Sequence, residues 1–460
     1  MQLVPQPGAA APLEWWRPTR TAPDVPAPVS QSSPVPFAAL VFFTIILLLA
    51  PQARFPILAP LHLAALGAGI AIGALLWDRS THHRRSVRWS REHWLVAGLL
   101  AWSLLTAPFS YWPGGSLALL SGVYLKSIAI LWLLAAVVDT TDRLRKLAWT
   151  LTAISVPLAG TAVWNFVSSA FISEEGEAVR RIAGYDAPLT SNPNDLALMI
   201  NLMVPLAFAL FLIHRRPLVR AALAAIIVLD AVAVVVTFSR AGFLTLATVL
   251  AACFWKLSRR PERAWAYGAL VAALLCIALL PGGYLGRLGT ITSVASDPTG
   301  SSQTRWADTL TAARFVAENP IFGAGLGMNV LALNQVRGPT WTEVHNVYLE
   351  YAADLGLPGL LAFLALLWSC TAGVGLVRRR AIREGRGEQL LHLAESLRLS
   401  LIAFALAGIF HPIAYQFYFY YFAGLAIALR NISGGTASVA PAPERRLPIP
   451  PPSLAVGKAG

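Results

Sequence analysis

The chain has 460 residues, of which 56% are hydrophobic and only 13% are charged. Soluble domains carry about 25% charged residues, so this chain lacks the polar surface that a soluble protein of its length requires. Its formal net charge is +13, but we do not expect so apolar a basic chain to bind nucleic acid. The composition therefore predicts an integral membrane protein in contact with membrane lipids.

About twelve apolar segments are long enough to predict transmembrane helices, because roughly 20 apolar residues cross the hydrocarbon core as a helix. They cover residues 35–53, 57–77, 93–109, 117–138, 147–172, 195–213, 218–237, 241–257, 264–281, 346–376, 395–411 and 413–429. These segments are continuously apolar rather than alternating, which argues against a β-barrel. The sequence predicts an all-α polytopic membrane protein.

The basic residues orient the predicted bundle. Most of the 36 Lys and Arg residues lie in alternate connections, which identifies those connections and both termini as cytoplasmic. The opposite, outer side carries few of them: Arg54, Arg180, Arg181, Arg240, Arg287, Arg305, Arg314 and Arg337.

Five regions follow from this topology. Residues 1–34 and 430–460 are Pro-rich and are expected to form disordered cytoplasmic tails; the first has no apolar stretch and does not resemble a cleavable signal peptide. Residues 35–281 hold the first nine helices, 282–345 a long partly helical loop on the outer side, and 346–429 the last three helices. The cysteines lie within predicted helices, where we expect them to pack in the core: Cys253, Cys276 and Cys370.

The long loop contains a predicted helix over 303–318 that ends at Asn319-Pro320. One apolar face repeats at helical spacing, formed by Trp306, Leu310, Ala313 and Ala317. Such a helix either lies on the outer membrane interface or packs against the bundle. The glycine-rich turn 323–327 follows no strand, so we expect it to serve tight packing rather than phosphate binding.

Three further features carry charge. His345 lies where the long loop re-enters the membrane, and Arg240 lies in the short connection between two predicted helices. Taken alone, His345 is either structural or catalytic, and Arg240 either reaches lipid head groups or binds an anion with its two-pronged guanidinium. Lys126 and Asp230 lie at similar depth within predicted helices, and we expect them to form an ion pair.

Taken together, these residues resemble the O-antigen ligase and O-antigen polymerase superfamily over roughly residues 180–375. The motifs that carry the resemblance are Arg181, Ser191–Asn194, Ser239–Gly242, Thr304–Trp306, Asn319–Gly325, His345–Leu349 and Leu355–Gly359. Their order, together with a long outer loop that ends in His345-Asn346, is more specific than any one motif.

The resemblance implies a C-type glycosyltransferase-like fold in the bacterial inner membrane, with an active site that faces the periplasm. It implies an enzyme that transfers a glycan from undecaprenyl diphosphate to an acceptor. Arg240 and Arg305, and with a looser local pattern Arg181, would bind the diphosphate. His345 would act on the acceptor hydroxyl.

Elementary chemistry agrees with these roles. A diphosphate is a good leaving group, and guanidinium groups stabilise its developing charge without a metal. The sequence has no DxD, HExxH or Cys/His cluster, so we expect no metal and no other cofactor. Direct attack at the anomeric carbon inverts its configuration.

The acceptor stays open among lipid A-core, another lipid-linked glycan and a protein. The activity is correspondingly that of a ligase, of an O-antigen or exopolysaccharide polymerase, or of a protein O-glycosylating ligase. A small-solute transporter is less favoured, because transporter sites tend to lie at the membrane midplane on broken helices.

Overall fold

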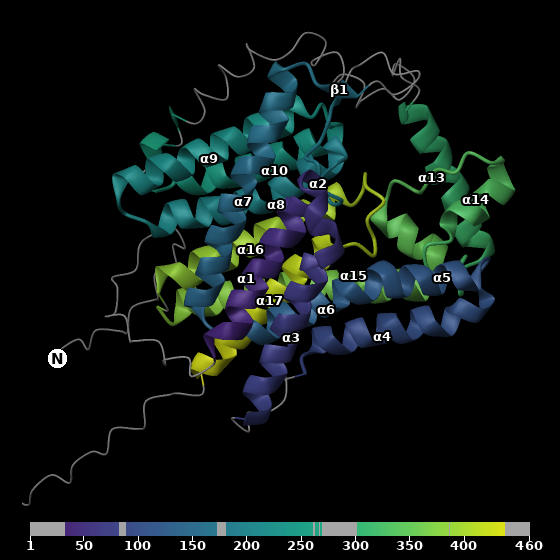
Figure 1. Cartoon of the computed structure of the whole chain (residues 1–460), viewed down its shortest axis with the longest axis horizontal. Helices are drawn as coiled ribbons and strands as arrows, with labels where there is room; N and C mark the ends of the chain where they lie inside the picture. Colours follow the sequence, from purple (N-terminus) through teal and green to yellow (C-terminus); the bar gives the residue numbers. More distant parts are fainter. Residues whose placement is uncertain are drawn as a thin grey trace, which may run out of the picture.

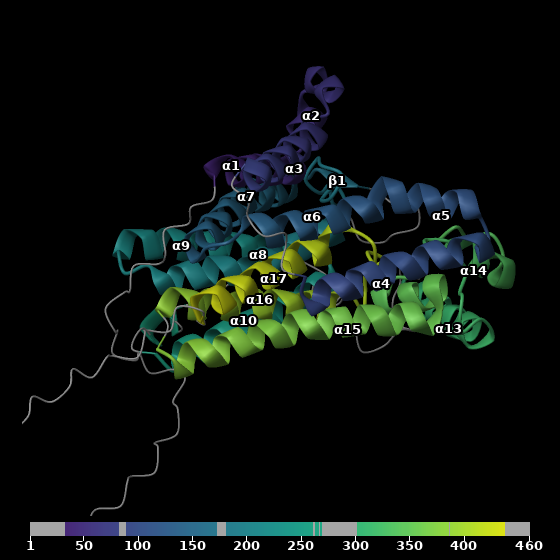
Figure 2. The ribbon, with the colours of Figure 1, turned by 90° about the horizontal axis from the view of Figure 1, so that it is seen from below.

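The computed structural model describes residues 33–81, 89–172, 181–260, 263–265, 267–268, 301–385 and 387–437. Within them the chain folds as a bundle of long helices that cross one another at different angles (Figures 1 and 2). The elements up to the first hairpin are α1 (Pro34–Leu49), α2 (Pro51–Arg54), the 3-10 helix η1 (Pro56–Leu61), α3 (Leu63–Thr81), α4 (Arg91–Thr106), the 3-10 helix η2 (Ala107–Phe109), α5 (Pro113–Leu119), the π-helical turn η3 (Leu120–Tyr124), α6 (Leu125–Val137), α7 (Thr141–Val167), β1 (Phe171–Ile172) and β2 (Arg181–Ile182). The remaining elements are α8 (Pro193–Ile213), α9 (Pro217–Val236), α10 (Arg240–Ser258), α13 (Ser301–Glu318), α14 (Asn329–Arg337), α15 (Val347–Arg383), α16 (Glu388–Ala407) and α17 (Phe417–Ala437).

The prediction of an all-α polytopic membrane protein is confirmed. In the described part of the chain, eight helices are long and apolar enough to cross a membrane. The predicted number of about twelve spans is not reproduced, partly because α1 and α4 are only 16 residues long, shorter than a full crossing requires. The predicted segment 264–281 lies almost entirely outside the described residues.

The two predicted tails also lie largely outside the described residues. The Ser33 side chain caps α1, which begins at Pro34. At the other end, α17 continues to Ala437, beyond the predicted boundary at 430. Cys253 and Cys370 are buried in the core as expected.

Helix α8 lies at the centre of the bundle. It is apolar on all sides and buried along nearly its whole length, as expected for a helix without a solvent or lipid face. It packs against α7, α9, α10 and α16, while α17 packs against α6 and α15 packs against α4 and α16. The amino-terminal end of α8 is consequently held in a fixed position.

Helices α13 and α14 lie together at one end of the bundle, beside the first turns of α15 (Figure 1). We call this the loop end. Helix α13 covers the predicted helix 303–318 and ends before Asn319-Pro320, as predicted. It packs against its neighbours through Ala312 and Phe315, which are buried, whereas Trp306 and Leu310 of the predicted apolar face are more than half exposed. The predicted face is therefore not the one that contacts the bundle.

Helix α15 is interrupted near the loop end at Gly356, which has a left-handed φ of +68°. The glycine-rich segment of the long loop supplies the backbone partners that the interrupted helix lacks. Ala324 N–H donates to Ala353 O at 2.7 Å, Gly325 N–H donates to Asp354 O at 2.8 Å, and Leu357 N–H donates to Pro320 O at 2.7 Å. The side chain of Asp354 also accepts hydrogen bonds from the backbone and side chain of Asn329.

Glycine is required in this segment because the backbones approach closely. Gly325 has a φ of +97°, and a Cβ atom there would lie 2.1 Å from the Ser110 side chain. The glycines therefore serve packing, as the sequence predicted.

The expected ion pair between Lys126 and Asp230 is wrong. Asp230 is buried and accepts a hydrogen bond from Ser155 on α7 at 3.0 Å. Lys126 is exposed on α6, which packs against α17 rather than α9. Similar depth in the membrane did not place the two residues on adjacent helices.

Substitution of Gly325 tests the docking of the loop. Gly325→Ala should lower the thermal unfolding temperature of the detergent-solubilised protein more than Gly338→Ala does. Gly338 has a similar φ of +92°, but no atom of the described residues lies within 4 Å of where its Cβ would be, so it reports backbone strain alone, about 1–3 kcal/mol. The clash with Ser110 adds about 1–3 kcal/mol at Gly325. Equal effects of the two substitutions would contradict tight packing of this segment.

Candidate functional site

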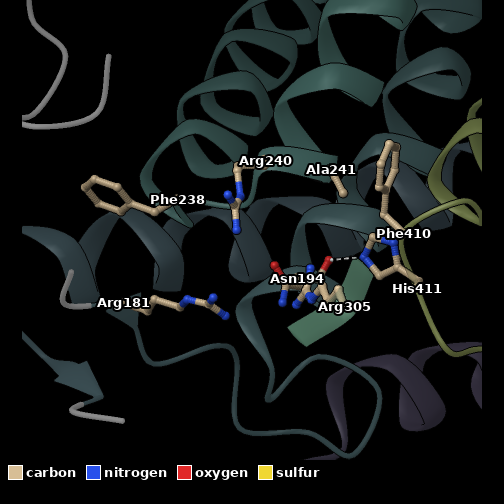
Figure 3. Close-up of a pocket in the computed structure, with 8 residues that line it drawn as sticks. All are labelled: Arg181, Asn194, Phe238, Arg240, Ala241, Arg305, Phe410 and His411. Carbon is tan, nitrogen blue, oxygen red and sulfur yellow. Dashed lines mark hydrogen bonds between the residues drawn. The ribbon is translucent and has the colours of Figure 1, made fainter. Parts of the chain in front are cut away.

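A pocket at the loop end gathers the three arginines that the sequence singled out. It is lined by Arg181, Asn194, Phe238, Arg240, Ala241, Arg305, Phe410 and His411 (Figure 3). The arginines come from strand β2, the start of α10 and the first turns of α13. Residues that are distant in sequence thus bring three guanidinium groups to one place.

Arg240 is positioned by the tight connection between α9 and α10. Ser239 caps α10 by accepting a hydrogen bond from Gly242 N–H at 3.1 Å. A Cβ atom at Gly242 would lie 2.7 Å from Ala197, so glycine lets α10 approach α8 closely. Arg240 Nη1 donates to Ser302 Oγ of α13 at 2.6 Å, which links two of the elements that carry pocket arginines.

Phe238, in the same connection, has a left-handed φ of +56°. This conformation is strained for a residue with a side chain. Phe238 is buried, with its ring 6.2 Å from that of Phe166, and the surrounding packing maintains the turn that directs Arg240 into the pocket.

Helix amino termini add to the positive potential of the pocket. Asn194 lies in the first turn of α8, where Asn192 is the N-cap. Arg240 and Ala241 begin α10, and Arg305 lies near the start of α13. Because helix amino termini carry a partial positive charge and uncompensated N–H groups, the arrangement favours an anion with more than one negative charge.

His345 lies beside the arginines, just before α15. It is half-buried, and its Nδ1 lies 3.0 Å from the carbonyl oxygen of Glu343. Since a carbonyl only accepts, we assign the proton to Nδ1, which leaves Nε2 as an acceptor. Burial lowers the pKa of His345 to about 4, and Arg305 acts in the same direction. The ring is therefore neutral at physiological pH and able to accept a proton.

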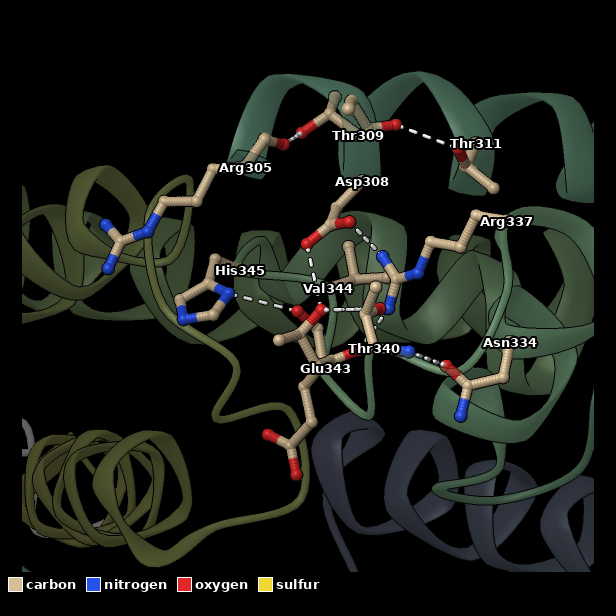
Figure 4. Close-up of polar contacts among 12 residues, drawn as sticks. Arg305, Asp308, Thr309, Thr311, Asn334, Arg337, Thr340, Glu343, Val344 and His345 are labelled. Atoms are coloured by element: carbon tan, nitrogen blue, oxygen red, sulfur yellow. Dashed lines mark hydrogen bonds and ion pairs between the residues drawn. The ribbon is translucent and has the colours of Figure 1, made fainter. Parts of the chain in front are cut away.

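A buried ion pair holds His345 and Arg305 relative to each other (Figure 4). Asp308, one turn after Arg305 on α13, pairs with Arg337 of α14. Arg337 Nη2 donates to Thr342 O at 2.7 Å, and Thr342 Oγ1 donates to Asp308 at 3.2 Å. The segment that leads to His345 is thus fastened to the helix that carries Arg305.

The sequence did not select three of the pocket residues: Phe238, His411 and Phe410. The last two lie in the connection between α16 and α17 and reach the pocket through the packing of α16 against α8. Their surrounding sequence carries no motif that would have identified them. Asp308 was not selected either, because its pairing with Arg337 depends on the folded arrangement of α13 and α14.

Fold and site together define a multi-pass membrane protein with an arginine-lined pocket beside a neutral histidine. Residues 223–364 match a family model described as O-Antigen ligase. The match includes Arg240, Arg305 and His345, whereas Arg181 and His411 lie outside it. No curated protein matches the chain.

The family match confirms the resemblance predicted from the motifs. The match of residues 223–364 to the O-antigen ligase model supports an O-antigen ligase- or polymerase-like membrane glycosyltransferase. Such enzymes act on a lipid-linked glycan and an acceptor.

The charge state of His345 can be measured directly. In selectively ¹⁵N-histidine-labelled protein in nanodiscs, His345 should titrate with a midpoint near pH 4, well below the usual value of about 6.5. Arg305→Ala should raise that midpoint because it removes a nearby positive charge. Arg314→Ala, an exposed substitution on the same helix, should leave it unchanged. A wild-type midpoint near 6.5 would contradict the described environment.

Proposed function

We propose that the protein transfers a glycan from undecaprenyl diphosphate to an acceptor hydroxyl. In this proposal the chain lies in the bacterial inner membrane with both termini in the cytoplasm, and the loop end faces the periplasm. The observation that carries the proposal is the convergence of Arg181, Arg240 and Arg305 on one pocket beside His345.

The donor would bind with its diphosphate between the three guanidinium groups. Each guanidinium can donate two parallel hydrogen bonds to phosphate oxygens. The amino termini of α8 and α10 add N–H groups and positive potential on the same side. This environment stabilises the charge that develops when the bond between the anomeric carbon and the phosphate oxygen breaks.

His345 would act on the acceptor. The acceptor oxygen attacks the anomeric carbon from the side opposite the diphosphate, its proton moves to Nε2 of His345, and the lipid diphosphate departs. The reaction inverts the anomeric carbon. Nδ1–H stays bonded to Glu343 O, which fixes the ring so that Nε2 is the atom that accepts the proton.

The low pKa of His345 keeps its ring neutral before the donor binds. A bound diphosphate brings negative charge next to Arg305 and Arg181, the groups that help to lower the histidine pKa. Donor binding therefore raises the basicity of His345 before it accepts the proton. His345 therefore stays unprotonated before the donor binds and becomes a stronger base only when the donor is present.

The acceptor distinguishes a ligase from a polymerase or a protein-glycosylating ligase. The donor chemistry is common to all three, because each would release the same lipid diphosphate. Transfer assays therefore need lipid A-core, a lipid-linked glycan and a protein as separate acceptors.

Substitution of the pocket arginines tests the proposal. Arg240→Ala and Arg305→Ala should each lower the rate of glycan transfer by about 10²–10³-fold, the range seen when a preorganised charge-stabilising donor is removed. The transfer rate of Arg305→Lys should lie between those of Arg305→Ala and wild type, because lysine retains the positive charge but cannot donate two parallel hydrogen bonds as a guanidinium group does. The measurement is transfer by purified protein from undecaprenyl-diphosphate glycan to each acceptor.

Arg314→Ala is the matched control, because Arg314 is an exposed arginine on the same helix, and it should transfer at the wild-type rate. The assay should give the same rates with and without a chelator. Normal turnover in both alanine variants, or activity that depends on added divalent metal, would contradict stabilisation by arginines.

A further inference from the structure

His411 is a buried titratable residue in the pocket wall that the proposed reaction does not use. Its side chain is only 2% exposed. Nδ1 lies 2.9 Å from Ala407 O at the end of α16, and Nε2 lies 3.4 Å from Asn194 O in the first turn of α8. The ring thus bridges the two helices beside the arginines (Figure 3).

Both ring nitrogens of His411 face carbonyl oxygens, which only accept hydrogen bonds. A neutral imidazole has a single N–H group, so one nitrogen must direct a lone pair at a carbonyl. Only the imidazolium form donates from both nitrogens. The shorter contact to Ala407 identifies Nδ1 as the protonated nitrogen of the neutral ring and leaves Nε2 to receive a second proton.

The empty pocket disfavours that second proton. Burial lowers the pKa of His411, and Arg305 acts in the same direction, although the two carbonyl contacts oppose them. Of the described residues that line the pocket, Arg181 and Arg240 are the other titratable ones, and both are cationic; His345, which is neutral, lies nearby. The carboxylates of the described residues on adjoining elements include Asp195, which follows Asn194 on α8; Glu343, with which Asp195 interacts electrostatically; and Glu350 of α15, which accepts a hydrogen bond from Ala414 N–H in the same connection as His411.

A diphosphate between the arginines would reverse this balance. Its two negative charges compensate the guanidinium groups that repel a proton from His411. In a low-dielectric pocket, such a change of neighbouring charge alters protonation strongly.

We propose that His411 takes up one proton from solvent at Nε2 when the lipid diphosphate binds, and that the imidazolium then holds the α16–α17 connection to α8. The proton converts the 3.4 Å contact with Asn194 O into a charged hydrogen bond and adds a positive charge to the pocket wall. His411 is thus a positioning residue whose protonation is coupled to donor binding. This inference rests on the proposed function.

A purely structural role for His411 predicts a different result. In that case the ring holds the same two carbonyls whether or not the pocket is occupied, and binding changes no protonation state. Proton uptake on donor binding therefore distinguishes the two roles, because a purely structural His411 would take up no proton.

The experiment is isothermal titration calorimetry of the full-length protein in nanodiscs with farnesyl-diphosphate-linked N-acetylglucosamine. Both phosphates of this probe are esterified, so neither titrates near neutral pH and any proton uptake belongs to the protein. Repeating the titration at one pH in buffers with different ionisation enthalpies gives the number of protons taken up. We expect about one proton per bound probe in wild type.

Substitutions identify the residue that takes up the proton. His345→Gln should retain the uptake, which excludes the neighbouring histidine as its source, and exposed His62→Gln is the matched control. His411→Gln should lose the uptake and bind the probe about ten-fold more weakly, the loss expected for one nearby charge in a partly buried site. Probe binding without proton uptake in wild type, or uptake that persists in His411→Gln, would overturn the inference.

A second measurement does not depend on the folding of the His411 variant. In His345→Gln, probe affinity should fall by about ten-fold per pH unit over the range in which the bound form holds the proton and the free form lacks it, and should level off once the bound form also loses it. Affinity that stays constant across this range would overturn the proton coupling. Failure of wild type to bind the probe would instead refute the proposed donor site.

Discussion

The interruption of α15 at Gly356 imposes the constraint on which the loop end depends. Backbone N–H and C=O groups near the membrane need partners within the protein, because lipid supplies none. Residues 320–325 of the long loop provide those partners at Ala353, Asp354 and Leu357. The loop is therefore fastened to a membrane helix by main-chain hydrogen bonds.

The docking of this loop segment determines where Arg305 and His345 lie. The docked segment joins α13, which carries Arg305, to α14, and the Asp308–Arg337 pair then fixes the segment that carries His345. A second set of constraints comes from the buried α8, whose first turn forms the pocket wall opposite His411. Arginines from three elements meet at a site that is positively charged and partly buried. Three guanidinium groups at one pocket suit a multiply charged anion, because each can donate two parallel hydrogen bonds to it.

Much of this arrangement was predictable from the sequence. Apolar segments of sufficient length indicate helices wherever a membrane surrounds them, and the glycines at 323–327 were correctly interpreted as packing residues. The motif residues Arg181, Arg240 and Arg305 indeed line one pocket. These features depend on local sequence and on the lengths that the bilayer requires.

The remaining features depend on which helices are neighbours, which one sequence does not specify. Asp230 bonds to Ser155 of α7 rather than to Lys126 because α9 packs against α7. The apolar face predicted for α13 includes Trp306 and Leu310, which are more than half exposed, and contact is instead made through Ala312 and Phe315. His411 reaches the pocket only because α16 packs against α8.

The most direct test of the central claim is a cryo-electron microscopy structure of the full-length protein in nanodiscs with a lipid-diphosphate-linked sugar bound. The account predicts phosphate density within hydrogen-bonding distance of the guanidinium groups of Arg181, Arg240 and Arg305. The anomeric carbon should lie on the side of the diphosphate that faces Nε2 of His345. Donor density elsewhere in the protein, with the arginine pocket empty, would contradict it.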